Sequence, residues 1–268
     1  MRRALRSLIA VLSLLVSSVL AADLPSFEAA SVRHSDPQSQ GGPNACAGGP
    51  GTSDPGMLHC INSSLATFVL QAYDVKWYEL VSPDWVIQGG SKTGYDVTAK
   101  IPPGATKADY RLMLQHLLTD RFHLVVHRET RELSVYSLVS AKAKPSMVPS
   151  SSPAPLGPHC ATSFIKNHFH LVCHNTSVKA LAEYLETQFW TTVTDQTGLS
   201  REYDFILDFI PAESWQAKVS WSPSSAITDE TPTLDTAISE QLGLKLVRGK
   251  GPVPVLVLDK ADKNPTEN

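Results

Sequence analysis

Two stretches of sequence decide the fold: HCINSSLATFVLQAY at residues 59–73 and VCHNTSVKALAEYLE at residues 172–186. In each, a cysteine, an asparagine and a serine precede a run whose apolar residues recur at helical spacing. A serine hydroxyl at an N-cap can accept a hydrogen bond from a first-turn N–H group. We therefore predict two equivalent helices, which begin directly after Ser64 and Ser177. The other aligned pairs are Cys60 with Cys173 and Asn62 with Asn175.

The correspondence continues downstream in the same order. TGYDVTAKIP (93–102) is matched by REYDFILDFIP (201–211), and DRFHLVVHRETRELSVYSLVSAK (120–142) by EQLGLKLVRGKGPVPVLVLDKAD (240–262). The last match aligns Leu124 with Leu244 and Leu138 with Leu258. Repetition in conserved order indicates a divergent tandem duplication.

Each half is expected to be a small α+β unit with two helices against one sheet. The second helix of the first half carries Tyr110, Met113, Leu114, Leu117 and Leu118 on one face, after a capping box formed by Thr106 and Asp109. Its counterpart in the second half carries Leu234, Ala237, Ile238 and Leu242 and ends at Gly243.

Strands are predicted at 95–99 and 203–209, where apolar and polar residues alternate, and a further strand is predicted at 26–33. We also predict one β-hairpin in each half. The first pairs 123–128 with 133–140, and the second pairs 244–248 with 253–258. Gly249, Gly251 and Pro252 would form the turn of the second hairpin.

Prolines divide the chain. Five of them lie in AKAKPSMVPSSSPAPLGP (141–158), a composition typical of a semi-extended linker. The predicted organisation is a signal peptide over 1–21, a first unit over 24–143, a Pro/Ser-rich linker over 144–158 and a second unit over 159–262.

The N-terminus is typical of a secretory signal peptide. Arg2, Arg3 and Arg6 precede an apolar segment over 8–20, and small residues favour cleavage after Ala21. The alternative is an uncleaved N-terminal anchor. With cleavage, the protein is exported to the periplasm or the medium and keeps no membrane span. Cleavage would remove three arginines from a chain whose formal net charge is −3, so nucleic acid is not an expected partner.

Four cysteines in an exported chain suggest disulfides. The spacing favours Cys46 with Cys60 and Cys160 with Cys173, each pair spanning the entry to a repeated helix; free thiols are the alternative. A competing hypothesis is a zinc or copper site, because six potential ligands crowd together: His159, Cys160, His168, His170, Cys173 and His174. On a strand, His168 and His170 would share one face and Cys173 the other, so we predict no metal or cofactor.

Catalytic motifs give little support for an enzyme. There is no G-x-S-x-G sequence, and DQTG at 195–198 is better explained as a turn before a strand. A ligand surface, if present, is expected at the long loop over 211–232 or at the Gly-rich stretch over 41–56. The tryptophans that could form a carbohydrate- or peptide-stacking surface are Trp77, Trp85, Trp190, Trp215 and Trp221.

Several segments resemble a family of secreted proteins associated with soil bacteria, a domain of unknown function. They include FEAASVRHSDP, GGPGTSDPG, VSPDW, YDVTAKIPPG, RLMLQHLLTDRFHLVVHRETRELSVYSLV and QLGLKLVRGKGPVPVLVLDKADKNPTEN. Some relatives carry a similar domain fused to a membrane metallopeptidase of the β-lactam-sensor type, which implies a sensory or partner role outside the cytoplasm. The order of elements is also similar to the short N-terminal domain of secretins and TonB-dependent receptors.

The sequence therefore predicts an exported, non-enzymatic binding or sensory protein whose partner is an envelope or extracellular protein or a small ligand. The alternatives are a secreted hydrolase acting on envelope or environmental polymers and a metal-binding protein that uses the His/Cys cluster.

Overall fold

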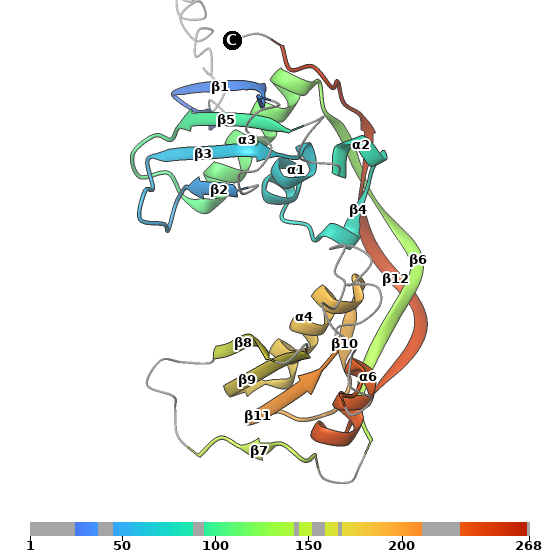
Figure 1. Cartoon of the computed structure of the whole chain (residues 1–268). Helices are drawn as coiled ribbons and strands as arrows, with labels where there is room; N and C mark the ends of the chain where they lie inside the picture. The colour runs from blue at the N-terminus through green and yellow to red at the C-terminus, as the bar shows by residue number, and fades with distance from the viewer. Residues whose placement is uncertain are drawn as a thin grey trace, which may run out of the picture.

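A computed structural model of the chain describes residues 25–36, 45–87, 94–141, 145–151, 159–165, 168–210 and 231–266. These residues form two α+β units that are joined by two long strands (Figure 1). The mixed α+β class is confirmed, whereas the expected signal peptide over 1–21 lies outside the described residues. No helix within the described ranges is long and apolar enough to cross a membrane.

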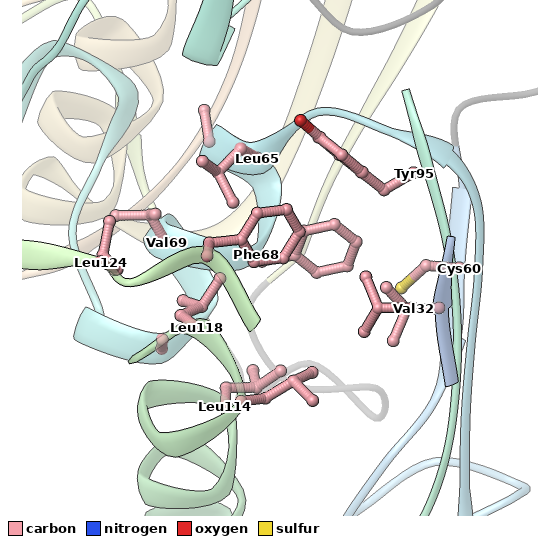
Figure 2. Packing of buried hydrophobic residues seen from close by; sticks show 14 of the residues in the cluster. Val32, Cys60, Leu65, Phe68, Val69, Tyr95, Leu114, Leu118 and Leu124 are labelled. Atoms are coloured by element: carbon pink, nitrogen blue, oxygen red, sulfur yellow. The ribbon is translucent and has the colours of Figure 1, made fainter. Parts of the chain in front are cut away.

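The first unit is built on an antiparallel sheet with the strand order β1–β5–β3–β2. The strands are β1 (Ala29–His34), β2 (Ala45–Gly48), β3 (Met57–Ser63) and β5 (Tyr95–Lys100), and helices α1 (Leu65–Tyr73) and α3 (Lys107–Phe122) pack against one face. Strand β5 contributes Tyr95, Val97 and Ala99 to the core between sheet and helices. Figure 2 shows Tyr95 in this core beside Phe68 of α1. Two short elements, η2 (Trp77–Glu79) and α2 (Asp84–Ile87), follow α1.

The second unit repeats this plan, with the strand order β7–β11–β9–β8. Its strands are β7 (Val148–Pro149), β8 (His159–Ile165), β9 (His168–Ser177) and β11 (Glu202–Phe209), and its helices are α4 (Val178–Phe189), α6 (Leu234–Ala237) and the single π-turn η3 (Ile238–Leu242). In sheet order, β7 occupies the place that β1 has in the first unit. The described part of the expected linker over 144–158 therefore does more than connect the two units. It supplies strand β7 to the second sheet and buries Met147 in the second core.

The helix termini follow the predicted caps. The Ser64 hydroxyl accepts a hydrogen bond from the Thr67 N–H at 3.2 Å, and Ser177 does the same for Ala180 at 3.1 Å. The capping box of Thr106 and Asp109 is present at the start of α3. These side chains satisfy first-turn donors that have no partner inside the helix.

A third sheet joins the units, with the order β10–β6–β12–β4. Here the two predicted hairpins are wrong. Strand β6 (Val125–Ser140) runs straight through the first expected turn, and β12 (Leu244–Lys260) runs through the second. The two strands pair with each other along their whole length, antiparallel, from Leu244 opposite Ser140 to Lys260 opposite Val125. Short parallel strands extend this ribbon at its two outer edges: β4 (Leu80–Val81) on β12 and β10 (Val193–Asp195) on β6.

The ribbon exchanges strands between the units. Leu258 from the end of β12 packs in the first core with Leu124, and Leu138 from the end of β6 packs in the second core with Leu244. Leu138 and Leu258 occupy aligned positions and are both leucine. The end of either strand can therefore fill the same core position and make the same backbone hydrogen bonds. The two cores therefore divide the chain differently from the expected units 24–143 and 159–262, since each receives a strand from the other half.

Candidate functional site

A cleft lies where η2 of the first unit meets α4 of the second. It has a volume of about 590 Å³, within the range of roughly 300–1,000 Å³ that is usual for small-molecule sites. Its lining is mostly apolar and comes from two short segments that are distant in sequence. The lining residues are Lys76, Trp77, Tyr78, Glu183, Glu186, Thr187 and Trp190.

Two indole rings dominate this cleft. The centroids of Trp77 and Trp190 are 6.5 Å apart and the ring planes are inclined at 57°, so the rings form a V rather than a stack. The Trp77 side chain is partly open to solvent, with 38% of the residue exposed. Two flat apolar faces are therefore available at a position where the two units meet.

Trp190 occupies an unusual position for its residue type. It is the C-cap of α4 and has φ 52°, in the left-handed region. Glycine or asparagine is the usual residue there, because a β-carbon is strained at positive φ. A bulky residue at positive φ is an outlier of the kind that marks functional sites, and here it sets the Trp190 indole against Trp77.

An ion pair closes one side of the cleft. The Lys76 ammonium contacts Glu186 Oε2, while Glu186 Oε1 accepts a hydrogen bond from the Val193 N–H at 3.2 Å. The Glu186 side chain is only 8% exposed and the Lys76 side chain is 52% exposed. The buried carboxylate thus has both oxygens occupied, and the pair connects the first unit to the second.

Two groups of the cleft, Lys76 and Tyr78, have shifted pKa values. Burial alone would lower the pKa of Lys76, but its contacts with Glu186 and Tyr78 raise it above the ordinary value. Burial raises the pKa of the Tyr78 phenol. Lys76 is therefore cationic and Tyr78 neutral over the physiological pH range, and the Lys76 Nζ lies 5.8 Å from the centre of the Tyr78 ring.

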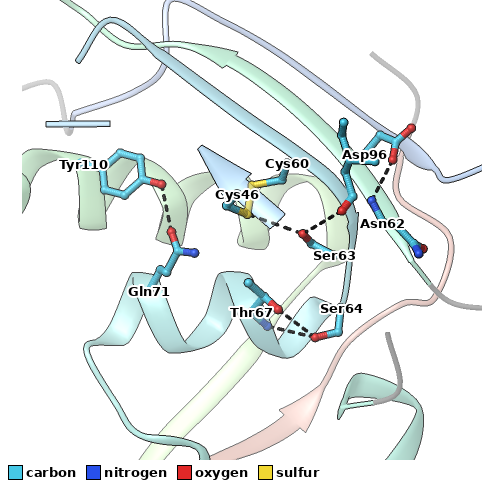
Figure 3. The surroundings of a disulfide bond; sticks show 10 residues. Cys46, Cys60, Asn62, Ser63, Ser64, Thr67, Gln71, Asp96 and Tyr110 are labelled. Atoms are coloured by element: carbon cyan, nitrogen blue, oxygen red, sulfur yellow. Dashed lines mark hydrogen bonds between the residues drawn. A yellow bond between two sulfur atoms is a disulfide. The ribbon is translucent and has the colours of Figure 1, made fainter. Parts of the chain in front are cut away.

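The four cysteines form two disulfides, Cys46–Cys60 and Cys160–Cys173, the pairs that the spacing favours. Each bond joins residues that lie opposite one another on adjacent antiparallel strands, with Cα separations of 4.0 and 4.1 Å. Figure 3 shows the first bond beside the entry to α1. Neither disulfide lines the cleft and each ties an edge strand to its sheet, so their role is structural.

Each disulfide stands beside the same local feature. The strand bulges at an asparagine in the left-handed region, Asn62 at φ 50° and Asn175 at φ 49°. The backbone N–H of Asn62 donates to Asp96 at 3.0 Å (Figure 3), and that of Asn175 donates to Asp204 at 2.8 Å. A serine hydroxyl also donates to each carboxylate at 2.6 Å, Ser35 to Asp96 and Ser150 to Asp204.

The predicted sharing of a strand face by His168 and His170 is confirmed. Both rings approach Asp208 Oδ1, at 3.4 and 2.6 Å, on the face of β9 opposite to the buried Cys173. The disulfide removes both cysteines of this segment as thiolate ligands. In the part of the chain that the structure describes, no group of three or more His, Cys, Asp or Glu side chains is arranged to hold a metal ion.

The two segments that were expected to form a ligand surface are described by the structure to different extents. Gly48 and Gly49 of the Gly-rich stretch line a smaller hollow of about 260 Å³ together with Lys107 and Arg111, and the guanidinium of Arg111 is paired with Asp74 at 2.7 Å. The other loop, over 211–232, lies outside the described residues apart from 231 and 232. At DQTG, the Asp195 carboxylate accepts hydrogen bonds from the N–H and hydroxyl of Thr197, as in a plain turn.

Sequence reasoning identified the two tryptophans but not their juxtaposition. Trp85 lies elsewhere, against the first core, and Trp215 and Trp221 lie outside the described residues. Lys76, Glu183 and Glu186 were missed, because a lysine in a loop and glutamates on a helix are ordinary surface residues by pattern. No signal in the sequence marks them, because the ion pair of Lys76 with Glu186 joins residues 110 positions apart.

Fold and cleft together define a two-unit α+β protein with an aromatic cleft between its units. The chain belongs to the family described as "Protein of unknown function (DUF3738)", whose model matches residues 66–261. The matched span contains every residue that lines the cleft. No curated protein and no solved structure matches the chain.

Proposed function

We propose that this chain is an exported binding protein that holds a small ligand in the cleft between its two units. The observation that carries the proposal is the meeting of Trp77 and Trp190, one from each unit, in a largely apolar cleft of about 590 Å³. Paired aromatic faces with a few polar groups at the rim are typical of sites that bind small molecules.

Polar groups in the cleft are engaged with one another or with the backbone, which favours binding over catalysis. Lys76 and Glu186 neutralise one another, and the Thr187 hydroxyl donates to the Tyr184 carbonyl at 2.7 Å. These groups hold the walls of the cleft in place. A catalytic pair would instead need a nucleophile or acid within hydrogen-bond reach of a base that is free to act.

Export is the second part of the proposal, and two observations support it. The N-terminal segment has the pattern of a signal peptide, and both disulfides are of the kind that persists in oxidising compartments. The shared bulges, caps and strand orders further support an origin of the two units by tandem duplication.

A sheet edge favours a second candidate, contact with a protein. Strand β8 is the edge of its sheet and all seven of its residues are exposed, including Phe164 and Ile165. Edge strands can pair with an extended segment of a partner. Cross-linking in the native envelope tests this candidate: an Ile165→Lys variant should lose a cross-linked partner that the parent chain retains, and an unchanged pattern would argue against it.

Ligand-observed NMR with a library of small cyclic compounds tests the principal proposal. We expect compounds whose signals respond to the native chain and no longer respond to a Trp77→Ala variant, because the partly exposed Trp77 can be truncated without opening a core. Trp85→Phe is the matched control, since Trp85 lies outside the cleft. Hits that persist equally in both variants would contradict binding in the cleft.

A further inference from the structure

The chemistry of the cleft narrows the class of ligand, an inference that rests on the proposed binding function. We propose that the cleft binds a neutral saccharide, with the apolar face of a sugar ring against the indoles of Trp77 and Trp190 and its hydroxyls at the rim. The argument uses the shape of the aromatic pair, the charges around it and the hydrogen-bonding groups beside it.

The aromatic pair suits a ring with apolar faces. The indoles of Trp77 and Trp190 are inclined at 57°, with centroids 6.5 Å apart, which leaves the exposed part of Trp77 open to a flat ligand. A pyranose presents C–H groups on its faces and hydroxyls around its edge. It can therefore cover indole surface while its polar groups point to the rim.

The charges disfavour other classes of ligand. A cation would compete with the Lys76 ammonium, which already lies near the Tyr78 ring and pairs with Glu186. An anion would approach the carboxylates of Glu183 and Glu186, which outnumber the single lysine of the lining. A hydrocarbon chain would remove Lys76 and Glu183 from water without replacing their hydrogen bonds, which is costly.

The rim of the cleft provides both hydrogen-bond acceptors and hydrogen-bond donors, which the hydroxyls of a sugar ring require. Glu183 is exposed and supplies acceptors only, while Lys76 has three N–H donors and gives one to Glu186. Sugar hydroxyls both donate and accept, so one ring can bridge from Glu183 to Lys76. A volume of about 590 Å³ exceeds the size of one hexose, which favours a short oligosaccharide.

The test is isothermal titration calorimetry of the full mature chain with four neutral oligosaccharides: cellopentaose, laminaripentaose, maltopentaose and chitotetraose. Sodium dodecanoate and benzyltrimethylammonium chloride serve as probes of the anionic apolar and cationic classes. We expect at least one oligosaccharide to bind, with affinity that changes less than twofold between low and high salt. Trp77→Ala should weaken binding at least tenfold and Trp85→Phe should not change it.

A second pair of variants separates hydrogen bonding from charge. Glu183→Gln keeps an acceptor without the charge and should reduce saccharide affinity only a few-fold, whereas Glu183→Ala should reduce it about tenfold. If no oligosaccharide binds while one of the other two probes, or a compound of another class in the NMR library, binds in a Trp77-dependent manner, the ligand class is wrong and the binding function stands. If none of the six compounds binds, and the NMR library also gives no Trp77-dependent hit, both proposals are overturned.

Discussion

Leu138 and Leu258 occupy matching positions in two similar stretches of sequence, yet each packs in the core of the opposite unit. Leu138 belongs to the first half of the chain and lies in the second core, where it is fully buried, and Leu258 makes the reverse crossing. The crossing occurs because β6 and β12 pair along their whole length instead of folding back as separate hairpins. Neither unit is therefore complete without a strand from the other half of the sequence.

Engineered cysteines test this exchange. Ser134 lies opposite Lys250 in the ribbon, so the double variant Ser134→Cys/Lys250→Cys should form a third disulfide on oxidation, detected by mass spectrometry of peptides. The matched control is Glu129→Cys/Ser134→Cys. These residues would be neighbours across the turn of a hairpin but are about 17 Å apart along a continuous strand. Cross-linking of the control pair alone would contradict the exchange.

Removal of either disulfide should destabilise the protein. Cys60 and Cys173 are buried and tie β2 and β8 to their sheets. We expect Cys46→Ser/Cys60→Ser to lower the free energy of unfolding by about 2–4 kcal/mol, and Cys160→Ser/Cys173→Ser to have an effect of the same order. Urea denaturation with circular dichroism measures both. An unfolding midpoint equal to that of the parent would show that the bond contributes no stability.

The carboxylate of Asp96 makes stability depend on pH. Burial alone would raise the pKa of Asp96, but hydrogen bonds from Ser35 and the Asn62 N–H, with the charge of Arg33, lower it below the ordinary value. The ionised form is thus favoured in the folded protein. The stabilisation is present above the unfolded-state pKa of about 3.9 and is lost as the pH falls through the lower folded-state pKa.

Asp96→Asn should remove that dependence. The variant should be less stable than the parent by about 1–2 kcal/mol at pH 7, because an amide accepts weaker hydrogen bonds than a carboxylate. The difference should shrink as the pH falls below about 4. Thermal or urea unfolding at a series of pH values measures it, and a constant difference across the series would refute the assignment.

Lys76 and Glu186 should be energetically coupled. Lys76→Met leaves the buried Glu186 carboxylate without its cation, and we expect a loss of about 1–1.5 kcal/mol, at the low end for charged partners because the ammonium is half exposed. In the double variant Lys76→Met/Glu186→Gln part of that loss should be recovered. A double-mutant cycle in urea, with Glu186→Gln as the other single variant, gives the coupling. Strictly additive effects would show that the contact does not join the units energetically.

Local patterns in the sequence were enough to predict α1, α3, α4 and the segment of α6 and η3, together with the strands β1, β5 and β11, because these depend on residues close in the chain. They did not predict edge strands such as β2 and β7. Ser64 and Ser177 are examples, since each caps a helix that begins at the next residue. The turn expected at Gly249 and Gly251 was wrong. Both residues continue the extended strand, since pairing with β6 satisfies the backbone that a hairpin would have satisfied.

The cleft could not be predicted from the sequence, because its two walls come from different units. Trp77 follows α1 and Trp190 ends α4, and only the packing of one unit against the other brings the two rings together. Sequence pattern specifies which face of a helix is apolar, but it does not specify which surface of a second unit will meet that helix. Lys76 and Glu186 illustrate the same limit, because their pairing depends on that packing.

Native mass spectrometry of the protein isolated under non-denaturing conditions from its own envelope or medium tests the central claim most directly. A Trp77→Ala variant prepared from the same source is the comparison. The account predicts a bound small molecule on the parent chain that is released on denaturation and is absent from the variant. A parent chain that carries no ligand, or the same ligand on both proteins, would contradict binding in the cleft between Trp77 and Trp190.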